Sequence, residues 1–409
     1  MSENKKLVPK RRFKEFQNAD AWKQCELGAV ADKFDNLRVP ITARDRVSGS
    51  IPYYGANGIQ DYVEDFTHDG EFVLLAEDGA NDLADYPVQY VNGKVWVNNH
   101  AHVLSGKEDI LDNRFLMNSL KQINIEPYLV GGGRAKLNAD VMMRLTLKIT
   151  SIDEQVKIGE FFTNLDQTIA FQQRKLEKMK SMKSAYLSEM FPAEGEFKPK
   201  RRFPGFTDAW EQRELGEVIE NVTDYVAAGS FASLRENVVY KSYPDYAQLV
   251  RTADLKSDFN NASPVYVDKR AFDFLYRVDL SKESIVLPNI GNCGEVYYIS
   301  PDQLPYERNV LGPNAILVRS DSSSNKFLSI LFQGENFQEK LKLIVSPNGQ
   351  TKFNKTELKQ IQLIFPNDIN EQNQIGQFFS NLDQTIAFQQ QKLEKLQNIK
   401  KAYLNEMFI

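Results

Sequence analysis

Residue types that bind metals or perform catalysis are few in this 409-residue sequence. Its three histidines are His68, His100 and His102, and the last two would point to one face of a strand because side chains alternate along it. No carboxylate or cysteine lies at ligand spacing beside that pair. We therefore predict no metal site and a structural role for these histidines.

The sequence motifs of two enzyme classes are missing. An adenine methyltransferase would need a glycine-rich cofactor motif and an NPPY-type or DPPY-type motif, and an ATP-driven enzyme would need G-x-x-x-x-G-K-[ST]. The chain has none of these, and GGGRAK at 131–136 is glycine-rich without the required spacing. We expect no catalytic residue and no cofactor on this chain.

Basic residues are distributed unevenly. Residues 1–14 carry six Lys or Arg, and Lys198, Lys200, Arg201 and Arg202 repeat the feature. Such a stub is typical of a solvated linker, and phosphate binding is the alternative. The stretch 61–85 has nine acids and no Lys or Arg, so we expect it to face solvent or a protein partner.

The chain contains an internal repeat, and this repeat determines how its other segments are interpreted. Residues 154–191 align without gaps onto residues 371–408, and 27 of the 38 positions are identical. Upstream, the segment PKRRFKEFQNADAWKQCELGAV from Pro9 matches PKRRFPGFTDAWEQRELGEV from Pro199. Each unit is therefore a basic stub, a variable domain and a conserved helix.

The variable regions mix short β-branched and aromatic runs with Gly, Asn and Pro, which is typical of an α+β domain. We predict two similar α+β domains separated by two long helices that pair as an antiparallel coiled coil with pseudo-twofold symmetry. The predicted segments are a basic N-terminal stub at 1–20, domain 1 at 21–150, a helix at 151–192, a basic linker at 193–208, domain 2 at 209–367 and a helix at 368–409.

Both conserved segments have apolar residues at heptad spacing, which predicts one shielded face along each helix. The predicted pairing residues are Ile158, Phe162, Leu165, Ile169, Gln172, Leu176 and Met179 in the first helix, and Ile375, Phe379, Leu382, Ile386, Gln389, Leu393 and Leu396 in the second. Because these faces are nearly identical while the domains differ, we expect the helices to pack on each other. The alternative is that each helix covers its own domain.

The polar positions Gln172 and Gln389 fall near the midpoint of the two faces. A buried glutamine pair there would fix the register of the helices at some loss of stability. The alternative is two solvated side chains at the edge of the seam. A 38-residue helix is about 57 Å long at roughly 1.5 Å per residue, longer than a domain core requires.

Composition supports a globular protein of two or three domains, with 42% hydrophobic and 26% charged residues. The net charge of −5 gives no support to nucleic-acid binding, so any such function depends on local charge. Two distant cysteines, Cys25 and Cys293, suit a reducing cytoplasm. With no run of 18 apolar residues, we expect no membrane association.

Duplicated variable domains, each followed by a helix containing NLDQTIAFQQ and AYLxEMF, resemble the specificity (S) subunit of type I restriction-modification systems. Further matches are IPYYGANGIQDYVEDF at 51–66, VWVNNHAHVL at 95–104 and the GRAKL and GQTKF stretches before the helices. The resemblance covers the whole chain.

The resemblance implies a non-catalytic DNA-binding subunit in which each domain recognises one half of a split, asymmetric sequence in double-stranded DNA. It also implies that the helices space the domains and dock two methyltransferase subunits, which bind S-adenosylmethionine and methylate adenine. ATP-driven restriction subunits would complete the complex. The alternative from another class is a coiled-coil scaffold that joins two protein-binding domains without touching DNA.

Arg and Asn suit bidentate contacts to bases, while Lys mainly contacts phosphates. For the first half-site we predict DNA contacts from Arg38, Arg44, Arg46, Tyr53, Tyr54, Asn57, Arg134 and Lys136. For the second we predict Arg235, Lys241, Arg251, Lys269, Arg270, Gln350 and Lys352. Two alternatives stay open: GRAK is only a turn before the last strand, and Tyr53 and Tyr54 are core aromatics.

Overall fold

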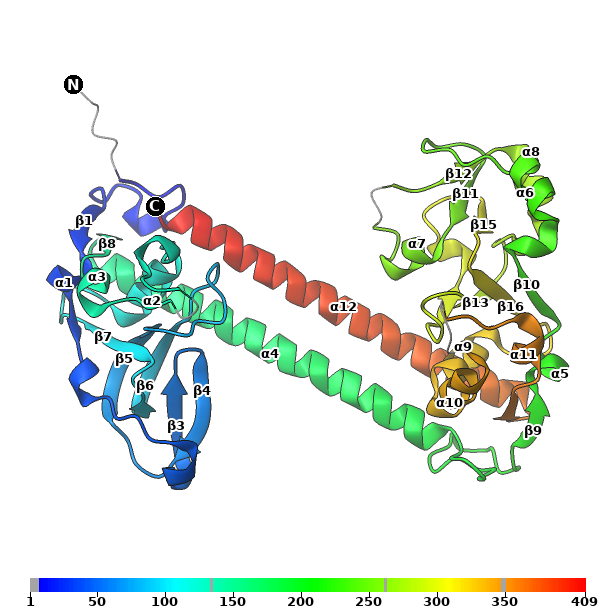
Figure 1. The fold of residues 1–409 in the computed structure, drawn as a ribbon, viewed down its shortest axis with the longest axis horizontal. Helices are drawn as coiled ribbons and strands as arrows, with labels where there is room; N and C mark the ends of the chain where they lie inside the picture. The colour runs from blue at the N-terminus through cyan, green and yellow to red at the C-terminus, as the bar shows by residue number, and fades with distance from the viewer. Residues whose placement is uncertain (1–6, 133–134, 261–262, 347–350) are drawn as a thin grey trace. The chain divides into compact units, whose positions relative to one another are not determined.

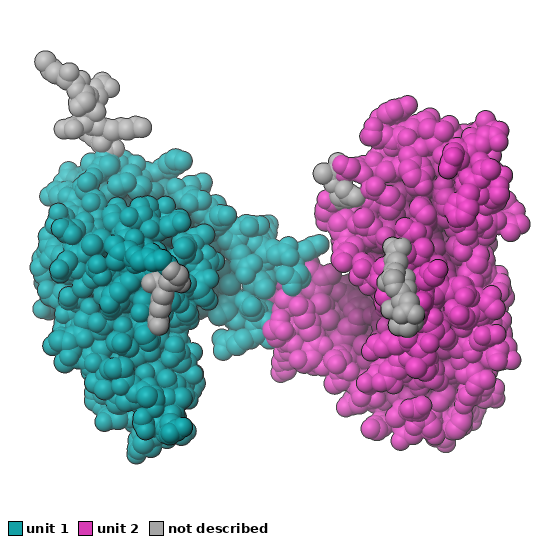
Figure 2. Space-filling model, viewed as in Figure 1, with its two compact units in different colours: residues 1–175, 390–409 teal, residues 176–389 magenta. Residues whose placement is uncertain are grey.

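The computed structural model describes residues 7–132, 135–260, 263–346 and 351–409 (Figure 1). It forms two compact units, residues 1–175 with 390–409 (unit 1) and residues 176–389 (unit 2), coloured separately in Figure 2. Two 39-residue helices, α4 (Ile152–Met190) and α12 (Ile369–Met407), each contribute one part to each unit. Each unit therefore combines one domain with parts of both long helices.

Unit 1 is built on a six-stranded sheet of order β2-β7-β5-β6-β3-β4, and β1 pairs separately with β8. Its strands are β1 (Lys23–Glu26), β2 (Ala31–Lys33), β3 (Ser48–Gly55), β4 (Gly58–Val63), β5 (His68–Ala76), β6 (Val88–Val97), β7 (Ala101–Gly106) and β8 (Thr146–Ile149). Its shorter helices are α1 (Leu27–Val30), α2 (Asn113–Lys121) and α3 (Ala139–Met142), with 3-10 turns η1 (Lys14–Phe16), η2 (Asp35–Leu37), η3 (Ala43–Asp45) and η4 (Glu126–Tyr128).

Unit 2 contains a four-stranded sheet, β10-β16-β13-β14, a three-stranded sheet, β12-β11-β15, and the pair β9–β17. Its strands are β9 (Glu211–Glu214), β10 (Asn221–Asp224), β11 (Ala247–Val250), β12 (Tyr266–Val267), β13 (Ser284–Pro288), β14 (Tyr297–Ile299), β15 (Asn309–Leu311), β16 (Ala315–Arg319) and β17 (Gln362–Phe365). Its shorter helices are α5 (Leu215–Val218), α6 (Phe231–Asn237), α7 (Thr252–Lys256), α8 (Lys269–Phe274), α9 (Asn325–Gln333), α10 (Glu335–Ile344) and α11 (Lys355–Lys359), with 3-10 turns η5 (Tyr225–Ala228), η6 (Tyr276–Val278) and η7 (Pro301–Gln303).

The central strand of each domain is apolar on both faces because both faces are covered. In β5, Val73 and Leu75 belong to the core under α2, whereas Phe72 and Leu74 belong to a smaller cluster on the other face. The same division occurs in β13 of unit 2, whose alternate residues belong to two different core clusters. The alternation follows from the two-residue period of a strand.

An aromatic cluster joins the long helices to the domain of unit 1. Phe408, just after α12, lies 6.1 Å from Trp22, 5.4 Å from Phe115 and 5.9 Å from Phe162, measured between ring centroids. Trp22 precedes β1, Phe115 lies on α2 and Phe162 lies on α4. The domain core of unit 1 is therefore completed by a residue from the far end of the sequence.

Unit 2 has the equivalent cluster. Phe191, just after α4, lies 6.0 Å from Trp210, 5.8 Å from Phe327 and 6.1 Å from Phe379. Trp210 precedes β9, Phe327 lies on α9 and Phe379 lies on α12. Each domain is thus completed by the helix that follows it and by the end of the other long helix.

The predicted shielded face of each long helix is confirmed. All ten heptad positions from 158 to 190 in α4, and the ten equivalent positions from 375 to 407 in α12, are buried or half-buried. The ends of this face pack into the domains, because Ile158 and Phe162 belong to the core of unit 1, and Ile375 and Phe379 to the core of unit 2. For these four residues, the alternative that each helix covers its own domain also holds.

Within each unit, the two helix parts run antiparallel. In unit 1, Phe161 contacts Tyr403 with ring centroids 5.2 Å apart, and Asp166 pairs with Lys400 at 2.5 Å. In unit 2, Tyr186 contacts Phe378 at 5.1 Å, and Lys183 pairs with Asp383 at 2.7 Å. In both units the residue number rises along one helix while it falls along the other, as predicted.

The middle of the shielded face is formed by the remaining predicted pairing residues. Leu176 and Leu393 are buried, and the positions that are half-buried are Leu165, Ile169, Met179, Leu382, Ile386 and Leu396. Gln172 and Gln389 are also buried, at 8% and 4% exposure, so the solvated alternative is wrong for both. That the two glutamines pair with each other stays a prediction.

The basic stubs are not solvated linkers throughout. Arg12 forms a bidentate ion pair with Glu154 at 2.8 and 2.5 Å, and the two side chains are 4% and 0% exposed. Arg202 forms the same pair with Glu371 at 2.6 and 2.8 Å. Charge-assisted bidentate pairs of this geometry are strong. They fix each stub to the first turns of the helix that follows its domain.

Among the described residues, the search for membrane-spanning helices found none of sufficient length and hydropathy.

Candidate nucleic-acid interface

A cluster of charged side chains surrounds the buried Glu77 and His102 at the end of β5 in unit 1. Glu77, the residue after β5, accepts hydrogen bonds from Arg38 Nη1 at 2.6 Å and Lys136 Nζ at 2.7 Å. The ring of His102, on β7, lies between Asp35 Oδ2 at 2.6 Å and the Leu137 carbonyl at 2.8 Å. Two of the predicted DNA contacts, Arg38 and Lys136, are thus brought together by one carboxylate.

The electrostatics of this cluster favour ionised carboxylates. Burial alone would raise the pKa of Glu77, but hydrogen bonds from Lys136 and Arg38 outweigh it, and the pKa of this carboxyl is lowered. The pKa of Asp35 is lowered in the same way, against the effect of burial, by its hydrogen bond with His102. The ion pair with Glu77 raises the pKa of Lys136. The cluster therefore holds its charges in pairs.

The expectation that no carboxylate lies beside the histidine pair is wrong in three dimensions. Ligand atoms of Asp35, Glu77 and His102 lie within 4.8 Å of one another, which is a spacing that a metal ion could use. The guanidinium of Arg38 and the ammonium of Lys136 already occupy both oxygens of Glu77. His100 lies 2.7 Å from Asp78. The carboxylates were not found because they lie far from the histidines in sequence.

Two predicted contacts in unit 1 belong to the fold itself. The side chain of Tyr53 is 1% exposed and stacks on Trp96, so the core alternative is correct for this residue and the DNA prediction is wrong. Arg38 is 14% exposed and also donates to the Ala101 carbonyl at 2.8 Å. In this conformation neither side chain can present its polar atoms to a base.

Two predicted contacts in the loops of the first domain, Arg46 and Asn57, already bind other residues of the domain. Arg46 lies over the ring of Tyr53 and pairs with Asp61 at 3.2 Å. Asn57 is exposed but donates to the Gly79 carbonyl and accepts from the Asn81 amide, both at 2.9 Å. These contacts fix the β3–β4 turn to the loop after β5.

Arg44 and Tyr54 differ in accessibility. Arg44 is exposed in η3, and no ion pair engages it among residues with described positions. Tyr54 is half-buried against the cluster on the second face of the sheet. Arg134 lies outside the described residues. Arg44 is therefore an accessible cation that no described ion pair engages.

In unit 2, three predicted contacts lie on two helices that pack together. Arg235 is exposed on α6, and Lys269 and Arg270 are 65% and 68% exposed on α8. Arg270 donates to Asn237 at the end of α6, and Lys269 pairs with Asp273 at 2.7 Å. Figure 1 shows α6 and α8 side by side, in agreement with their contacts. This pair of helices presents the densest group of predicted cations.

Two other predicted contacts of unit 2 are held by acids. Lys241 pairs with Asp245 at 2.5 Å and lies 3.6 Å from Asp268. Arg251 forms a bidentate contact with Asp254, which is 1% exposed at its side chain, and so caps α7. Both cations are partly neutralised by the fold. We therefore rank them below the exposed cations of α6 and α8.

The last predicted pair of unit 2 lies before α11. Lys352 is exposed and forms an antiparallel β-bridge with Ile290, just after β13. Gln350 lies outside the described residues.

Exposed aromatic residues were missed by the sequence analysis. On α6, Phe231 is 81% exposed, and Tyr276 in η6 is 65% exposed with the guanidinium of Arg277 over its ring. On the long helices, Phe171 and Phe388 are 58% and 67% exposed. The signal for the last two was present: both stand in the repeated TIAFQQ sequence, off the heptad face.

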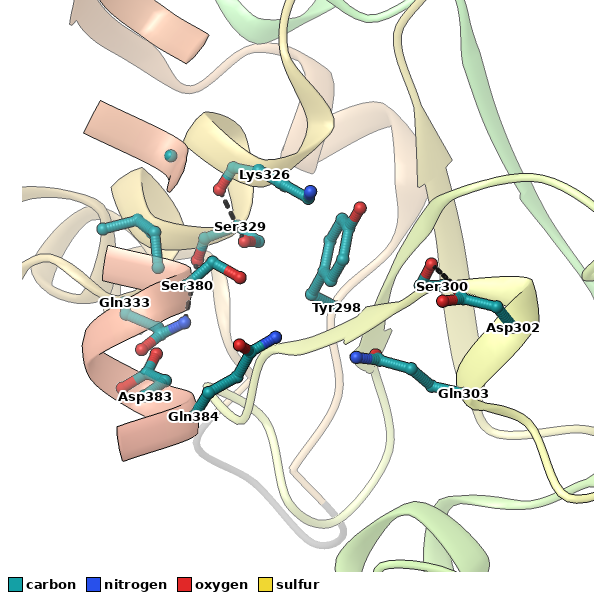
Figure 3. A pocket seen from close by; sticks show the side chains of 12 residues that line it. Tyr298, Ser300, Asp302, Gln303, Lys326, Ser329, Gln333, Ser380, Asp383 and Gln384 are labelled. Carbon is teal, nitrogen blue, oxygen red and sulfur yellow. Dashed lines mark hydrogen bonds between the residues drawn. The ribbon is translucent and has the colours of Figure 1, made fainter. Parts of the chain in front are cut away.

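A polar cavity of about 300 Å³ in unit 2 lies beside α12 (Figure 3). Ser380, Asp383 and Gln384 come from α12, and Lys326 and Gln333 come from α9. None of the predicted DNA contacts with a described position lines it. The cavity is thus separate from the candidate DNA-binding side chains.

The chain was compared with curated proteins and solved structures. It is 49% identical over 137 residues to a putative type I restriction enzyme specificity subunit, S.HindORF215P, of Haemophilus influenzae, covering 34% of this chain and 35% of that protein. It is 32% identical over 127 residues to the type I restriction enzyme EcoprrI specificity subunit of Escherichia coli, covering 31% and 30%. The matches thus span about a third of the length of these curated relatives.

The fold has a solved counterpart. The crystal structure of a type I restriction-modification system S subunit from M. genitalium matches with a TM-score of 0.67 and 15% identity, over 98% of this chain and 99% of that one. At this identity the match establishes the fold alone. The family model of the type I restriction modification DNA specificity domain matches residues 19–181 and residues 207–398, which is most of the chain. The chain therefore belongs to the type I restriction-modification DNA specificity family, with two copies of its domain.

Proposed function

We propose that this chain is the sequence-specific DNA-binding subunit of a type I restriction-modification complex, in which each domain recognises one half of a split, asymmetric sequence. The family match to two domain copies supports this proposal. Further support comes from the contrast between the conserved edges and the diverged interiors of the repeat. Different recognition surfaces on equivalent supports suit two unlike half-sites.

The observation that carries the proposal is the repetition of the supports themselves. Each domain has its own aromatic cluster and its own Arg–Glu ion pair, and these are equivalent in the two units although the sheets of the domains differ. The accessible cations also lie on different elements, with Arg44 in η3 of unit 1 and Arg235 on α6 of unit 2. Such surfaces would make different contacts with DNA while attaching to the complex in the same way.

The partners and cofactors follow from this function. The chain would act with two methyltransferase subunits and with restriction subunits in the cytoplasm, and methylation would occur at adenine N6. S-adenosylmethionine and ATP would be bound by those partners, and no catalytic group would come from this chain. The long helices would set the spacing between the two half-sites.

Sequencing of methylated adenines tests the proposal directly. Cells that express this chain with its methyltransferase are expected to show one methylated motif, made of two unlike half-sites separated by unread bases. Cells with the methyltransferase alone serve as the control and should lack that motif. An unmethylated genome despite a soluble complex, or a motif that is the same in the control, would contradict the proposal and favour a scaffold that does not bind DNA.

The exposed phenylalanines predict where the methyltransferase subunits dock. Phe171 and Phe388 have identical neighbours in the repeat, which suits two copies of one partner. Replacing either with serine is expected to weaken the binding of one copy by about tenfold or more, because buried aromatic residues dominate interface energies. Native mass spectrometry should then show loss of one methyltransferase from each single variant and of both from the double variant.

The control for docking is another exposed apolar residue. Leu343, on α10, is 85% exposed and has no place in the helix repeat, so Leu343→Ser should leave the stoichiometry unchanged. All of these surface substitutions should leave thermal stability close to that of the unsubstituted chain. Two methyltransferase copies on the double variant would exclude this docking site.

A further inference from the structure

The two domains carry a lysine at the same place in their folds. Lys136 forms an antiparallel β-bridge with Asp78, two residues after the end of β5. Lys352 forms the same kind of bridge with Ile290, two residues after the end of β13. The two lysines therefore extend from equivalent backbone positions.

The neighbouring backbone contacts confirm this equivalence. Leu137, after the first lysine, donates its N–H to the Glu77 carbonyl at 2.7 Å. Phe353, after the second, donates to the Asn289 carbonyl at 3.2 Å. Glu77 in unit 1 thus occupies the position that Asn289 occupies in unit 2. The side chain at this position is a carboxylate in unit 1 and an amide in unit 2.

That difference changes the state of the lysine in unit 1. Lys136 Nζ lies 2.7 Å from Glu77 Oε1, while Arg38 binds the other oxygen and His102 lies 3.6 Å from it. The ammonium of Lys136, whose side chain is 47% exposed, is therefore paired with a carboxylate that is only 10% exposed.

The lysine in unit 2 has no such partner among the residues that the structure describes. Asn289 offers a neutral side chain, which donates to the Phe353 carbonyl at 3.3 Å. Ile316 takes the place of His102, because β7 and β16 pair with β5 and β13 in matching registers, and it is fully buried. In the part of the chain with described positions, no ion pair engages Lys352, which is exposed.

We infer that the two equivalent lysines have different roles: Lys352 contacts a DNA phosphate, whereas Lys136 is a positioning residue that holds its segment against Glu77. The inference rests on the proposed function, since it assigns contacts within a DNA-binding surface. A cation that binds phosphate displaces a counterion, and this displacement makes the affinity depend on salt. A lysine already paired with a carboxylate displaces none.

The fold of unit 2 shows that the charged cluster is not required for the shared backbone arrangement. The bridge and the following hydrogen bond form there with Asn289 and Ile316 in place of Glu77 and His102. In unit 1, removal of Lys136 would leave one oxygen of the buried Glu77 without its ion-pair partner, a cost that the neutral Asn289 does not incur in unit 2. The role of Lys136 in unit 1 therefore depends on its ion pair with Glu77.

The test compares two matched substitutions, Lys136→Met and Lys352→Met, in the full chain bound to its methyltransferase. Affinity is measured at several KCl concentrations, using a labelled duplex that carries the methylated motif found by sequencing. Lys352→Met should make the slope of log affinity against log salt shallower by about one unit. Lys136→Met should leave the slope unchanged.

Hydrogen exchange of the DNA-free complex gives the second readout. Lys136→Met should speed exchange of the Leu137 amide by about tenfold, which corresponds to about 1.4 kcal/mol. Lys352→Met should leave the Phe353 amide unchanged. Glu77→Gln should reproduce the effect at Leu137 if Lys136→Met does not fold, and Lys136→Arg should retain protection.

The possible outcomes separate the inference from the proposed function. A shallower slope for Lys136→Met, or an unchanged slope for Lys352→Met, would overturn the inference while DNA binding itself stands. An unsubstituted complex that binds no duplex in a salt-dependent manner would overturn the proposed function instead. Unchanged exchange at Leu137 in both Lys136→Met and Glu77→Gln would remove the positioning role.

Discussion

A chain in which residues 23–149 are replaced by its own residues 211–365 is expected to direct methylation by its methyltransferase partner to a motif whose two halves contain the same recognised bases. The replaced segments begin at β1 and β9 and end at β8 and β17, so each transplanted domain keeps its own first and last strand. The flanking tryptophans, Trp22 and Trp210, stay in place and pack into equivalent aromatic clusters. Because the supports are the same, the second domain should fold in the first position.

Methylated-adenine sequencing measures the result, and the reciprocal exchange is its control. Two copies of the first domain should give the other half-site twice. The unsubstituted chain should retain two unlike halves. A motif that stays asymmetric after either exchange would show that the domains do not determine the half-sites.

The substitution Phe408→Ala is expected to destabilise unit 1 by about 3–5 kcal/mol, the usual cost of truncating a core phenylalanine. Phe408 is 9% exposed and contacts three aromatic rings, those of Trp22, Phe115 and Phe162. Its removal would leave a cavity between α2, α4 and the start of the domain. The effect should appear in the N-terminal domain although the substitution lies at the other end of the sequence.

Hydrogen exchange can show which of the two units loses stability in this variant. The amide of Val73 in β5 reports on unit 1, and that of Val286 in β13 reports on unit 2. Phe408→Ala should speed exchange mainly at Val73, and the matched Phe191→Ala should do so mainly at Val286. Ile409→Ala, at a 39% exposed residue, should change neither. Equal effects of Phe408→Ala in both units would contradict the cluster described here.

The sequence predicted those features that depend on local pattern. Heptad spacing identified the shielded faces of α4 and α12, and the repeat indicated that both helices have the same environment. The pattern could not show what covers each part of a face. Ile158 and Phe162 continue the heptad series without a break, yet they pack into a domain, because an apolar side chain fits either kind of partner.

The candidate DNA contacts were less predictable because side-chain availability depends on distant residues. Arg44 and Arg38 are six positions apart, but only Arg38 meets Glu77 when β5 and η2 come together. Lys136 and Lys352 look alike in GRAKL and GQTKF, and their difference arises from the residues opposite them in the fold. Neither distinction is encoded within a few residues of the cation.

The placement of Phe408 has a consequence for synthesis on the ribosome. Domains usually fold as units and in order, from the N-terminus, while the chain is still growing. The first domain must instead wait with Trp22 and Phe115 uncovered until α12 has been translated. A ribosome that stalls within α12 would therefore release a protein whose earliest-made domain is the incomplete one, a substrate for chaperones and proteases rather than a functional half.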